Sequence, residues 1–250
     1  MYAHARINPF YAARRQRPAA VPAPERRQRP VYAKLPLAPI TASPVPELTS
    51  LYHNTEAGPY GDRRYPGNCS GLLIRDLLRY FRPGTVYDPM TGSGTCRDVC
   101  KELGIYCWSN DLRQGFDACG PAKFTDAFAF CWLHPPYWRM KVYNDDPRCL
   151  SRAPTLKAFL ERYELLLKNA ATAVMPGGRV VVLMGDYCDR EAGFVPLVYW
   201  TKKIAFRAGL RQHCTDIVRF SHGAGSSKKV YRSSFIPGLH DVCMIFEKGR

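Results

Sequence analysis

The stretch Tyr87-Asp88-Pro89-Met90-Thr91-Gly92-Ser93-Gly94-Thr95 constrains this chain most, because an apolar strand ending breaks there into a glycine loop and then a helix-like segment. Two glycines two residues apart let the backbone turn sharply and approach a ligand closely. The free N–H groups of the following helix favour a negatively charged group. The stretch therefore predicts a ligand site, although a Gly-x-Gly after a strand is also a common tight turn.

The residues on either side of the loop indicate which kinds of ligand it can bind. A phosphate-binding P-loop needs a lysine directly after its last glycine, and no lysine follows Gly94 before Lys101. Arg97 stands where a dinucleotide fingerprint needs a small residue, which disfavours NAD. Asp111 follows the apolar run 105–108, and a carboxylate at the tip of a second strand is well placed to accept both ribose hydroxyls of an adenosine. A solvated Asp after a strand is the alternative.

A second motif, His134-Pro135-Pro136-Tyr137-Trp138, follows the apolar run 127–133. Asp-Pro-Met-Thr-Gly-Ser-Gly-Thr at 88–95, followed by x-Pro-Pro-Tyr at the end of a later strand, resembles the S-adenosylmethionine-dependent methyltransferases of the adenine-N6 and cytosine-N4 class. The resemblance extends over about residues 65–248. It implies S-adenosyl-L-methionine as cofactor and methylation of a nucleic-acid base, with adenine-N6 in DNA slightly favoured over cytosine-N4.

The chemistry of an exocyclic amine explains the second motif. The amine is a poor nucleophile because its lone pair is delocalised into the ring. When the side chain at position 134 accepts one N–H of the amine and a proline-fixed carbonyl accepts the other, the lone pair turns toward the methyl group. Tyr137 would stack on a base that has left its helix. His134 departs from the usual Asp, Asn or Ser, since a neutral imidazole accepts only one hydrogen bond.

The resemblance also assigns roles to individual residues. An Asp near position 117 meets the adenine amino group in the family, and Phe116 is placed to cover the adenine ring. Asn68 and Ser70 precede the cofactor strand, where helix capping is the simpler role. The predicted cofactor-binding residues are Asp88, Pro89, Gly92, Gly94, Asp111, Phe116 and Asp117. The predicted catalytic residues are His134, Pro135, Pro136 and Tyr137.

A net charge of +15 and a pI near 9.5 indicate a polyanionic partner, because clustered Lys and Arg neutralise phosphates. Residues 1–48 are rich in proline and arginine, which predicts a flexible arm. The loop 221–237 is basic, and a solvated loop is the alternative to a phosphate contact there. The predicted substrate-binding residues are Trp138, Lys228, Lys229 and Arg232.

The alternation of elements after Val86 predicts one α/β domain over residues 49–250. We expect a Rossmann-like methyltransferase fold, that is, a mostly parallel doubly wound sheet with an antiparallel edge strand. Within 65–82 we expect a turn and a cap at 66–70, followed by a helix that carries Leu72 to Tyr80. Further helices are expected over 156–174 and 194–209, and the later strands over 179–185, 214–220 and 241–247. The polar residues 139–148 are expected to form a loop beside the site, where loops of this kind commonly act as lids.

Ten cysteines are scattered along the chain without a Cys-x-x-Cys, which is the pattern of reduced thiols in a cytoplasmic protein. Cys96 and Cys100 share a helix face, but a metal site needs further ligands at a fixed spacing, so we predict no metal. No apolar stretch has the length of a membrane span. The sequence leaves the oligomeric state open.

Two alternatives to DNA methylation remain. The substrate can be structured RNA, whose modifying enzymes also use x-Pro-Pro-Tyr. The chain can also be a basic nucleic-acid-binding protein that keeps a methyltransferase fold without catalysis, since fold does not imply function.

Overall fold

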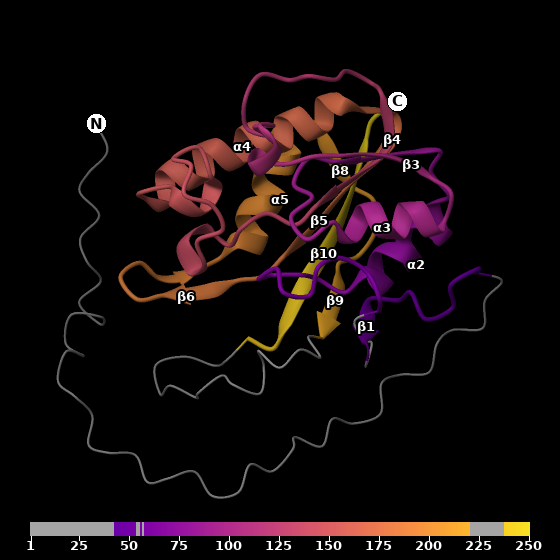
Figure 1. The fold of residues 1–250 in the computed structure, drawn as a ribbon, viewed down its shortest axis with the longest axis horizontal. Coiled ribbons are helices and arrows are strands. Elements are labelled where there is room, and N and C mark those ends of the chain that lie inside the picture. Colours follow the sequence, from indigo (N-terminus) through magenta and orange to yellow (C-terminus); the bar gives the residue numbers. More distant parts are fainter. Residues whose placement is uncertain (1–42, 54–55, 57, 221–237) are drawn as a thin grey trace, which may run out of the picture.

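The computed structural model describes residues 43–53, 56, 58–220 and 238–250 (Figure 1). The helices and strands are, in chain order, β1 (Leu51–His53), α2 (Gly71–Phe81), β2 (Thr85–Asp88), α3 (Thr95–Glu102), β3 (Tyr106–Ser109), β4 (Phe128–Leu133), α4 (Leu156–Ala173), β5 (Val174–Met184), β6 (Tyr187–Asp189), β7 (Gly193–Val195), α5 (Leu197–Arg207), β8 (Leu210–Gln212), β9 (Ile217–Phe220) and β10 (His240–Lys248). Short 3-10 helices, η2 (Leu112–Gln114), η3 (Trp138–Met140) and η4 (Leu150–Arg152), lie in the connections. Within the described ranges, no helix combines the length and apolarity needed to cross a membrane.

The main sheet has the strand order β1-β9-β10-β5-β4-β2-β3. Strand β10 runs antiparallel to β5 and to β9, and the other neighbours along this path are parallel. The short strand β8 also pairs with β10 in antiparallel fashion. The predicted α/β class, the mostly parallel sheet and its antiparallel strand are therefore confirmed. Strands β9 and β1 lie outside β10, so the antiparallel strand is near this edge without being outermost.

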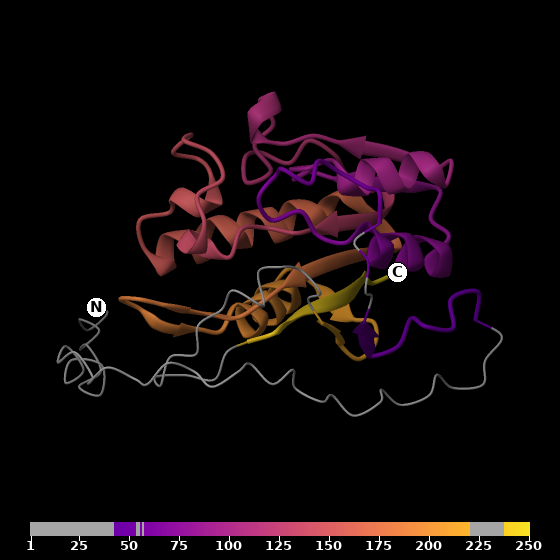
Figure 2. The same ribbon diagram turned by 60° about the horizontal axis from the view of Figure 1, so that its bottom comes forward.

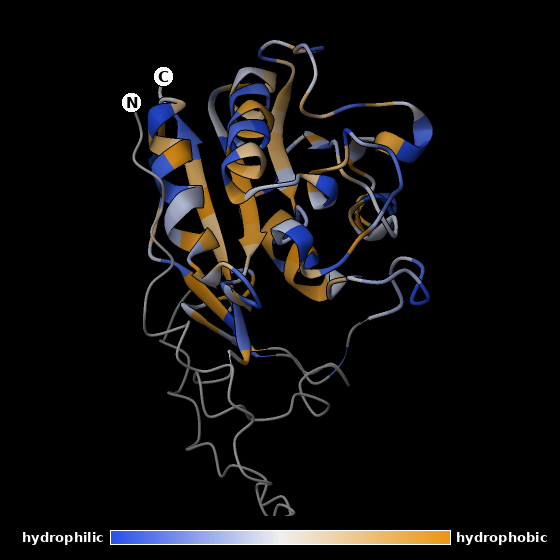
Figure 3. Cartoon of the chain, turned by 90° about the vertical axis from the view of Figure 1, so that its left-hand side faces the viewer, coloured by the Kyte–Doolittle hydropathy of each residue, from blue (hydrophilic) through white to orange (hydrophobic). Residues whose placement is uncertain are grey.

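Both faces of the sheet are covered by helices, which explains why β4 and residues 180–184 of β5 are apolar without interruption. Along β4, Phe130 and Trp132 pack with α2 and α3, whereas Cys131 and Leu133 pack with α4 and α5. Strand β5 divides its valines in the same alternating way. Figure 3 shows the apolar strands between helices whose apolar sides turn toward them.

The helix starts follow capping chemistry that is readable in the sequence. Ser70 precedes α2, and its hydroxyl accepts a hydrogen bond from the Leu72 N–H at 3.3 Å. The capping role expected for Ser70 is thus confirmed. Asn68 instead joins its loop to the start of α3, since its Oδ1 accepts from the Thr95 hydroxyl at 2.8 Å. Helix α2 ends where Arg82 adopts a left-handed conformation with φ 48°.

The helix predicted over 194–209 is shorter than expected, because its first residues belong to a hairpin. Strands β6 and β7 pair in antiparallel fashion, and this hairpin extends away from the main sheet (Figures 1 and 2). Its turn forms because Asp189 Oδ1 accepts the N–H groups of Glu191 and Ala192, both at 2.9 Å. Asp186 accepts the Val198 N–H at 2.8 Å at the start of α5.

Candidate functional site

A cavity lies at the carboxyl ends of β2, β3 and β4, where a doubly wound sheet usually binds its ligand. It joins the two sequence motifs, because the glycine loop lines one part and the start of the His-Pro-Pro motif lines another. The predicted residues that line it are Asp88, Pro89, Gly92, Asp111, Phe116, Asp117, His134 and Pro136. Gly94, Pro135, Tyr137 and Trp138 do not line this cavity.

Asp88 ends β2 and is almost fully buried, at 1% exposed. Its Oδ2 accepts a hydrogen bond from the Ser109 hydroxyl at 2.9 Å. Burial raises the pKa of Asp88 to about 7, and the hydrogen bonds from Ser109 and Thr91 only partly oppose this rise. A cation bound beside this buried carboxyl would favour its ionised form.

The glycine loop is fixed against the end of β3. Gly92 has φ +50°, and its N–H donates to Asp111 Oδ2 at 3.1 Å. The other oxygen, Oδ1, accepts the Arg113 N–H at 2.9 Å and so caps η2. Each carboxylate oxygen keeps a second lone pair, so Asp111 still has acceptor capacity toward the cavity.

Phe116 and Asp117 follow η2 and form the next part of the wall. The Phe116 ring meets Trp108 edge to face, with ring centroids 4.7 Å apart. Asp117 Oδ1 accepts the Cys119 N–H at 2.9 Å. Phe116 and Asp117 thus give the cavity wall an aromatic ring and a carboxylate, two groups that a flat heterocycle with an amino group can use.

His134 follows β4 and lies in a polar group that sequence reasoning missed in part. Tyr137 Oη is 3.5 Å from His134 Nε2. Asp241, at the start of β10, forms an ion pair with Arg219 of β9. Both His134 and Tyr137 interact electrostatically with Asp241. The antiparallel direction of β10 explains this meeting, because it brings the amino end of that strand to the carboxyl ends of the others.

The charge states within this group follow from burial and from Arg219. Burial lowers the pKa of His134 to about 4, so its ring is neutral at physiological pH. Burial alone would raise the pKa of Asp241, but Arg219, His134 and Tyr137 outweigh it, and the net pKa is lowered. A neutral imidazole and an ionised carboxylate therefore stand together at this end of the sheet. No sequence spacing links residues 134, 219 and 241, so only the strand order could reveal them.

Trp138 was predicted to contact the substrate, but its side chain is in the core. It is 2% exposed, and its Nε1 donates to the Ala153 carbonyl at 2.9 Å. Its φ of 48° is unusual for a bulky residue and directs the chain into η3. Pro135 is also buried. Trp138 thus anchors the segment after the motif and presents no open face to a substrate.

Three residues from distant segments meet in the wall of the cavity, and the sequence did not indicate their contact. Tyr65 and Tyr143 stack with centroids 6.1 Å apart, and the Arg113 guanidinium lies 4.8 Å from the Tyr65 ring centroid. Arg113 Nη2 also donates to the Tyr143 carbonyl at 2.8 Å. Tyr65, Arg113 and Tyr143 all line the cavity. We call these three residues the cover.

The remaining predicted contacts, Lys228, Lys229 and Arg232, belong to residues 221–237 and lie outside the described part of the chain. The polar loop 139–148 is described and held by ion pairs. Arg139 reaches Asp189 on the β6–β7 hairpin at 2.7 Å, and Arg148 pairs with Asp146 at 2.7 Å. Its role as a lid stays a prediction.

No protein-family model matches this chain, and no curated protein matches it. Among solved structures, this chain is similar to a suspected DNA modification methylase from Thermus thermophilus in complex with S-adenosyl-L-methionine. The two share 15% identity over 66% of this chain and 56% of that chain, with a TM-score of 0.39. It is also similar to TrmN from Thermus thermophilus, with 17% identity, coverage of 72% and 49%, and a TM-score of 0.38. A SAM-dependent methyltransferase from Archaeoglobus fulgidus has 16% identity, coverage of 73% and 96%, and a TM-score of 0.44.

The chain spans about half the length of the two Thermus thermophilus proteins. Identities and TM-scores this low do not establish a function. The residues around the cavity therefore carry the functional evidence.

Proposed function

We propose that this protein transfers a methyl group from S-adenosyl-L-methionine to the exocyclic amino group of a DNA base, with adenine-N6 slightly favoured over cytosine-N4. The observation that carries the proposal is the single cavity shared by the Asp88 glycine loop and by His134 and Pro136. A methyl donor and an acceptor amine need two such adjoining sites. The bound cofactor would supply an activated methyl group on a positively charged sulfur.

The carboxylates and the aromatic ring in the cavity wall fit this cofactor. Asp111 offers free lone pairs for two ribose hydroxyls, and Phe116 with Asp117 suits an adenine ring with its amino group. Asp88 offers a buried carboxyl to the cationic part of the molecule, which would favour its ionised form. A ligand that is both an adenosine and a cation matches these groups better than a phosphate ester does.

On the acceptor side, catalysis would be mostly positioning. A neutral His134 can accept one N–H of the target amine, and the carbonyl of Pro135 or Pro136 can accept the other. Tyr137 would stack on the base. Because Tyr137 does not line the cavity, the base would occupy the space between the cavity and the Tyr137 ring. Asp241 would orient the ring of His134. Its carboxylate would also stabilise the positive charge that develops on the amino nitrogen of the base.

The charge of the chain supports a nucleic-acid partner. Most of the excess positive charge lies before residue 43 and in 221–237. We propose that the arm 1–48 and the basic loop with Lys228, Lys229 and Arg232 bind phosphates, and that the domain 49–250 carries the chemistry. Binding should then weaken steeply with salt.

The deciding experiment measures transfer of labelled methyl from S-adenosyl-L-methionine to unmethylated double-stranded DNA, single-stranded DNA and RNA. Mass spectrometry then identifies the modified nucleoside. N6-methyladenine or N4-methylcytosine in DNA is the expected product. Label only in RNA would replace DNA by RNA in the proposal. Absence of label together with absence of cofactor binding by calorimetry would overturn it.

Tyr137→Ala separates the two halves of the site. We expect this variant to lose methyl transfer by about 100-fold or more while its cofactor affinity changes little, because the lost contact is with the base. Tyr199→Ala, at an exposed position on α5, is the matched control and should keep both properties. Equal loss of transfer and cofactor binding in Tyr137→Ala would contradict the assigned role.

A further inference from the structure

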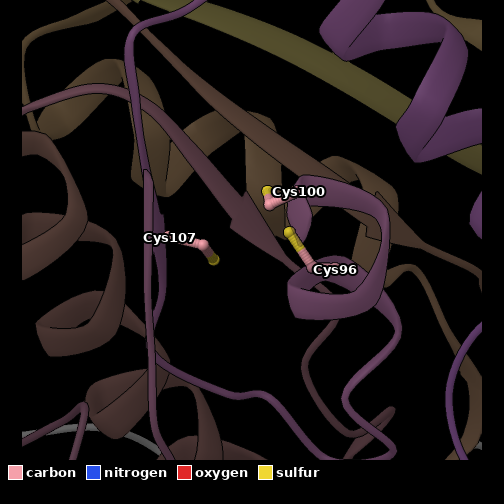
Figure 4. Close-up of side chains that lie close together, drawn as sticks. All are labelled: Cys96, Cys100 and Cys107. Carbon is pink, nitrogen blue, oxygen red and sulfur yellow. The ribbon is translucent and has the colours of Figure 1, made fainter. Parts of the chain in front are cut away.

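Three cysteine side chains gather beneath the glycine loop, and the proposed reaction uses none of them. Cys96 and Cys100 lie one turn apart on α3, and Cys107 lies on the adjacent strand β3 (Figure 4). Their sulfur atoms all lie within 4.8 Å of one another. The sequence predicted only the first two on a common face, because the position of β3 beside α3 could not be read from spacing.

Two of the three cysteines are buried, and the third, Cys107, is half-buried. Cys96 is 2% exposed and Cys100 is 0% exposed, and both pack in the apolar layer with Val99 and Val86. All three thiols are free, with no disulfide among them.

We propose that Cys96, Cys100 and Cys107 form a three-sulfur site for a soft monovalent metal ion of the copper(I) class. Sulfur ligands select soft ions. Zinc would need a fourth ligand, and among the described residues the group of candidate ligand side chains contains only these three. With metal–sulfur distances of about 2.3 Å, a trigonal ion separates its sulfurs by roughly 4 Å, so a small contraction of the present cluster suffices.

The cavity gives the ion a path to the cluster. Cys96 lines the cavity as well as the cluster, and Asp88 interacts electrostatically with all three thiols. Binding exchanges thiol protons for the ion, and these protons leave toward the cavity. The site depends on side-chain geometry alone and does not require that the protein transfers methyl groups.

The test titrates the reduced full-length protein with copper(I) under anaerobic conditions, against a competing chromophoric chelator. The exposed Cys214 is replaced by Ala in every sample, so that it adds no surface binding. We expect one tightly bound ion, with about three sulfur neighbours by X-ray absorption spectroscopy. Cys96→Ala, Cys100→Ala and Cys107→Ala should each weaken binding at least about 100-fold, whereas Cys243→Ala, which is buried on β10, should leave it unchanged.

Folding must be separated from ligation, since Cys100 is fully buried. Cys107 is the least buried of the three, so Cys107→Ser is the variant that keeps the fold, and its thermal unfolding is recorded beside that of the parent. Unchanged copper affinity in the folded Cys107→Ser variant, or in the triple Ala variant, would overturn the proposal. So would two-coordinate sulfur in the absorption spectrum, or zinc bound more tightly than copper(I).

Discussion

The backbone N–H of Gly92 donates to Oδ2 of Asp111 at 3.1 Å, which joins the loop after β2 to the end of β3. The same carboxylate holds η2 through the Arg113 N–H. One side chain thus holds two segments of the cavity wall in place. In the proposed function its remaining lone pairs meet ribose.

Replacing Asp111 by Ala should weaken cofactor binding. Hydrogen bonds to a charged group contribute about 1.5–3 kcal/mol each, so we expect a roughly 10- to 100-fold higher Kd. Isothermal titration calorimetry measures this directly. The control is Glu161→Gln on α4, whose carboxylate is exposed and pairs with Lys157 on the same helix. An unchanged Kd in Asp111→Ala would remove Asp111 from the cofactor site.

Cofactor binding should depend on pH through Asp88. Because burial raises the pKa of Asp88 to about 7, the free protein holds this carboxyl partly protonated at neutral pH. A cationic ligand favours the ionised form, so affinity should rise as the pH increases through about 7 and level off above it. Calorimetry from about pH 5.5 to about pH 8.5, in steps of about half a unit, measures the slope. Asp88→Asn should bind weakly with no such slope.

The same pKa predicts the stability of the free protein. The folded state binds more protons than the unfolded chain between the usual carboxyl pKa of 3.8 and about 7. The contribution of Asp88 to the free energy of unfolding is therefore present at low pH and declines as the pH rises across this window. The stability of the parent relative to Asp88→Asn should therefore decrease as the pH rises. Thermal unfolding of both proteins across this pH window measures the change.

Asp241→Asn should slow methyl transfer without loss of cofactor affinity. It removes the charge that faces His134 and leaves Arg219 buried without its partner, which costs on the order of 3 kcal/mol. The paired replacement Arg219→Met with Asp241→Leu removes both charges and should regain stability while transfer stays low. Recovery of transfer in this double variant would show that the pair only supports the fold.

Tyr143→Ala should release the cofactor faster, because it removes the ring that stacks on Tyr65. An aromatic pair contributes about 0.5–1.5 kcal/mol, which corresponds to a roughly 2- to 12-fold higher dissociation rate. Tyr143→Phe keeps the ring and should behave like the parent. Stopped-flow displacement of bound cofactor compares the three proteins, and identical rates would mean that the cover does not retain the ligand.

Local sequence signals predicted the elements of the fold well. The serine cap of α2, the glycine loop before α3 and the apolar strands β4 and β5 each depend on neighbouring residues only, so their order could be read along the chain. The β6–β7 hairpin was missed because its strands have three residues each, too few to show a period.

The parts of the candidate site that could not be predicted from the sequence depend on contacts between distant segments. Asp241 reaches His134 only because β10 runs antiparallel beside β5. Tyr65 meets Tyr143 across two loops that carry no repeating pattern. Trp138 was assigned to the substrate from its place in the motif, and its left-handed backbone, which turns it into the core, has no sequence signature.

The position of β10 within the sheet has a consequence for synthesis. Strands β5 and β9 both pair with β10, so neither has this partner until residues 240–248 have been made. A nascent chain that stops before His240 would carry two open strand edges and lack Asp241. We expect such a chain to sediment with aggregates when its lysate is centrifuged. Synthesis of residues 240–248 therefore supplies both the strand that joins β5 to β9 and the Asp241 of the proposed acceptor site.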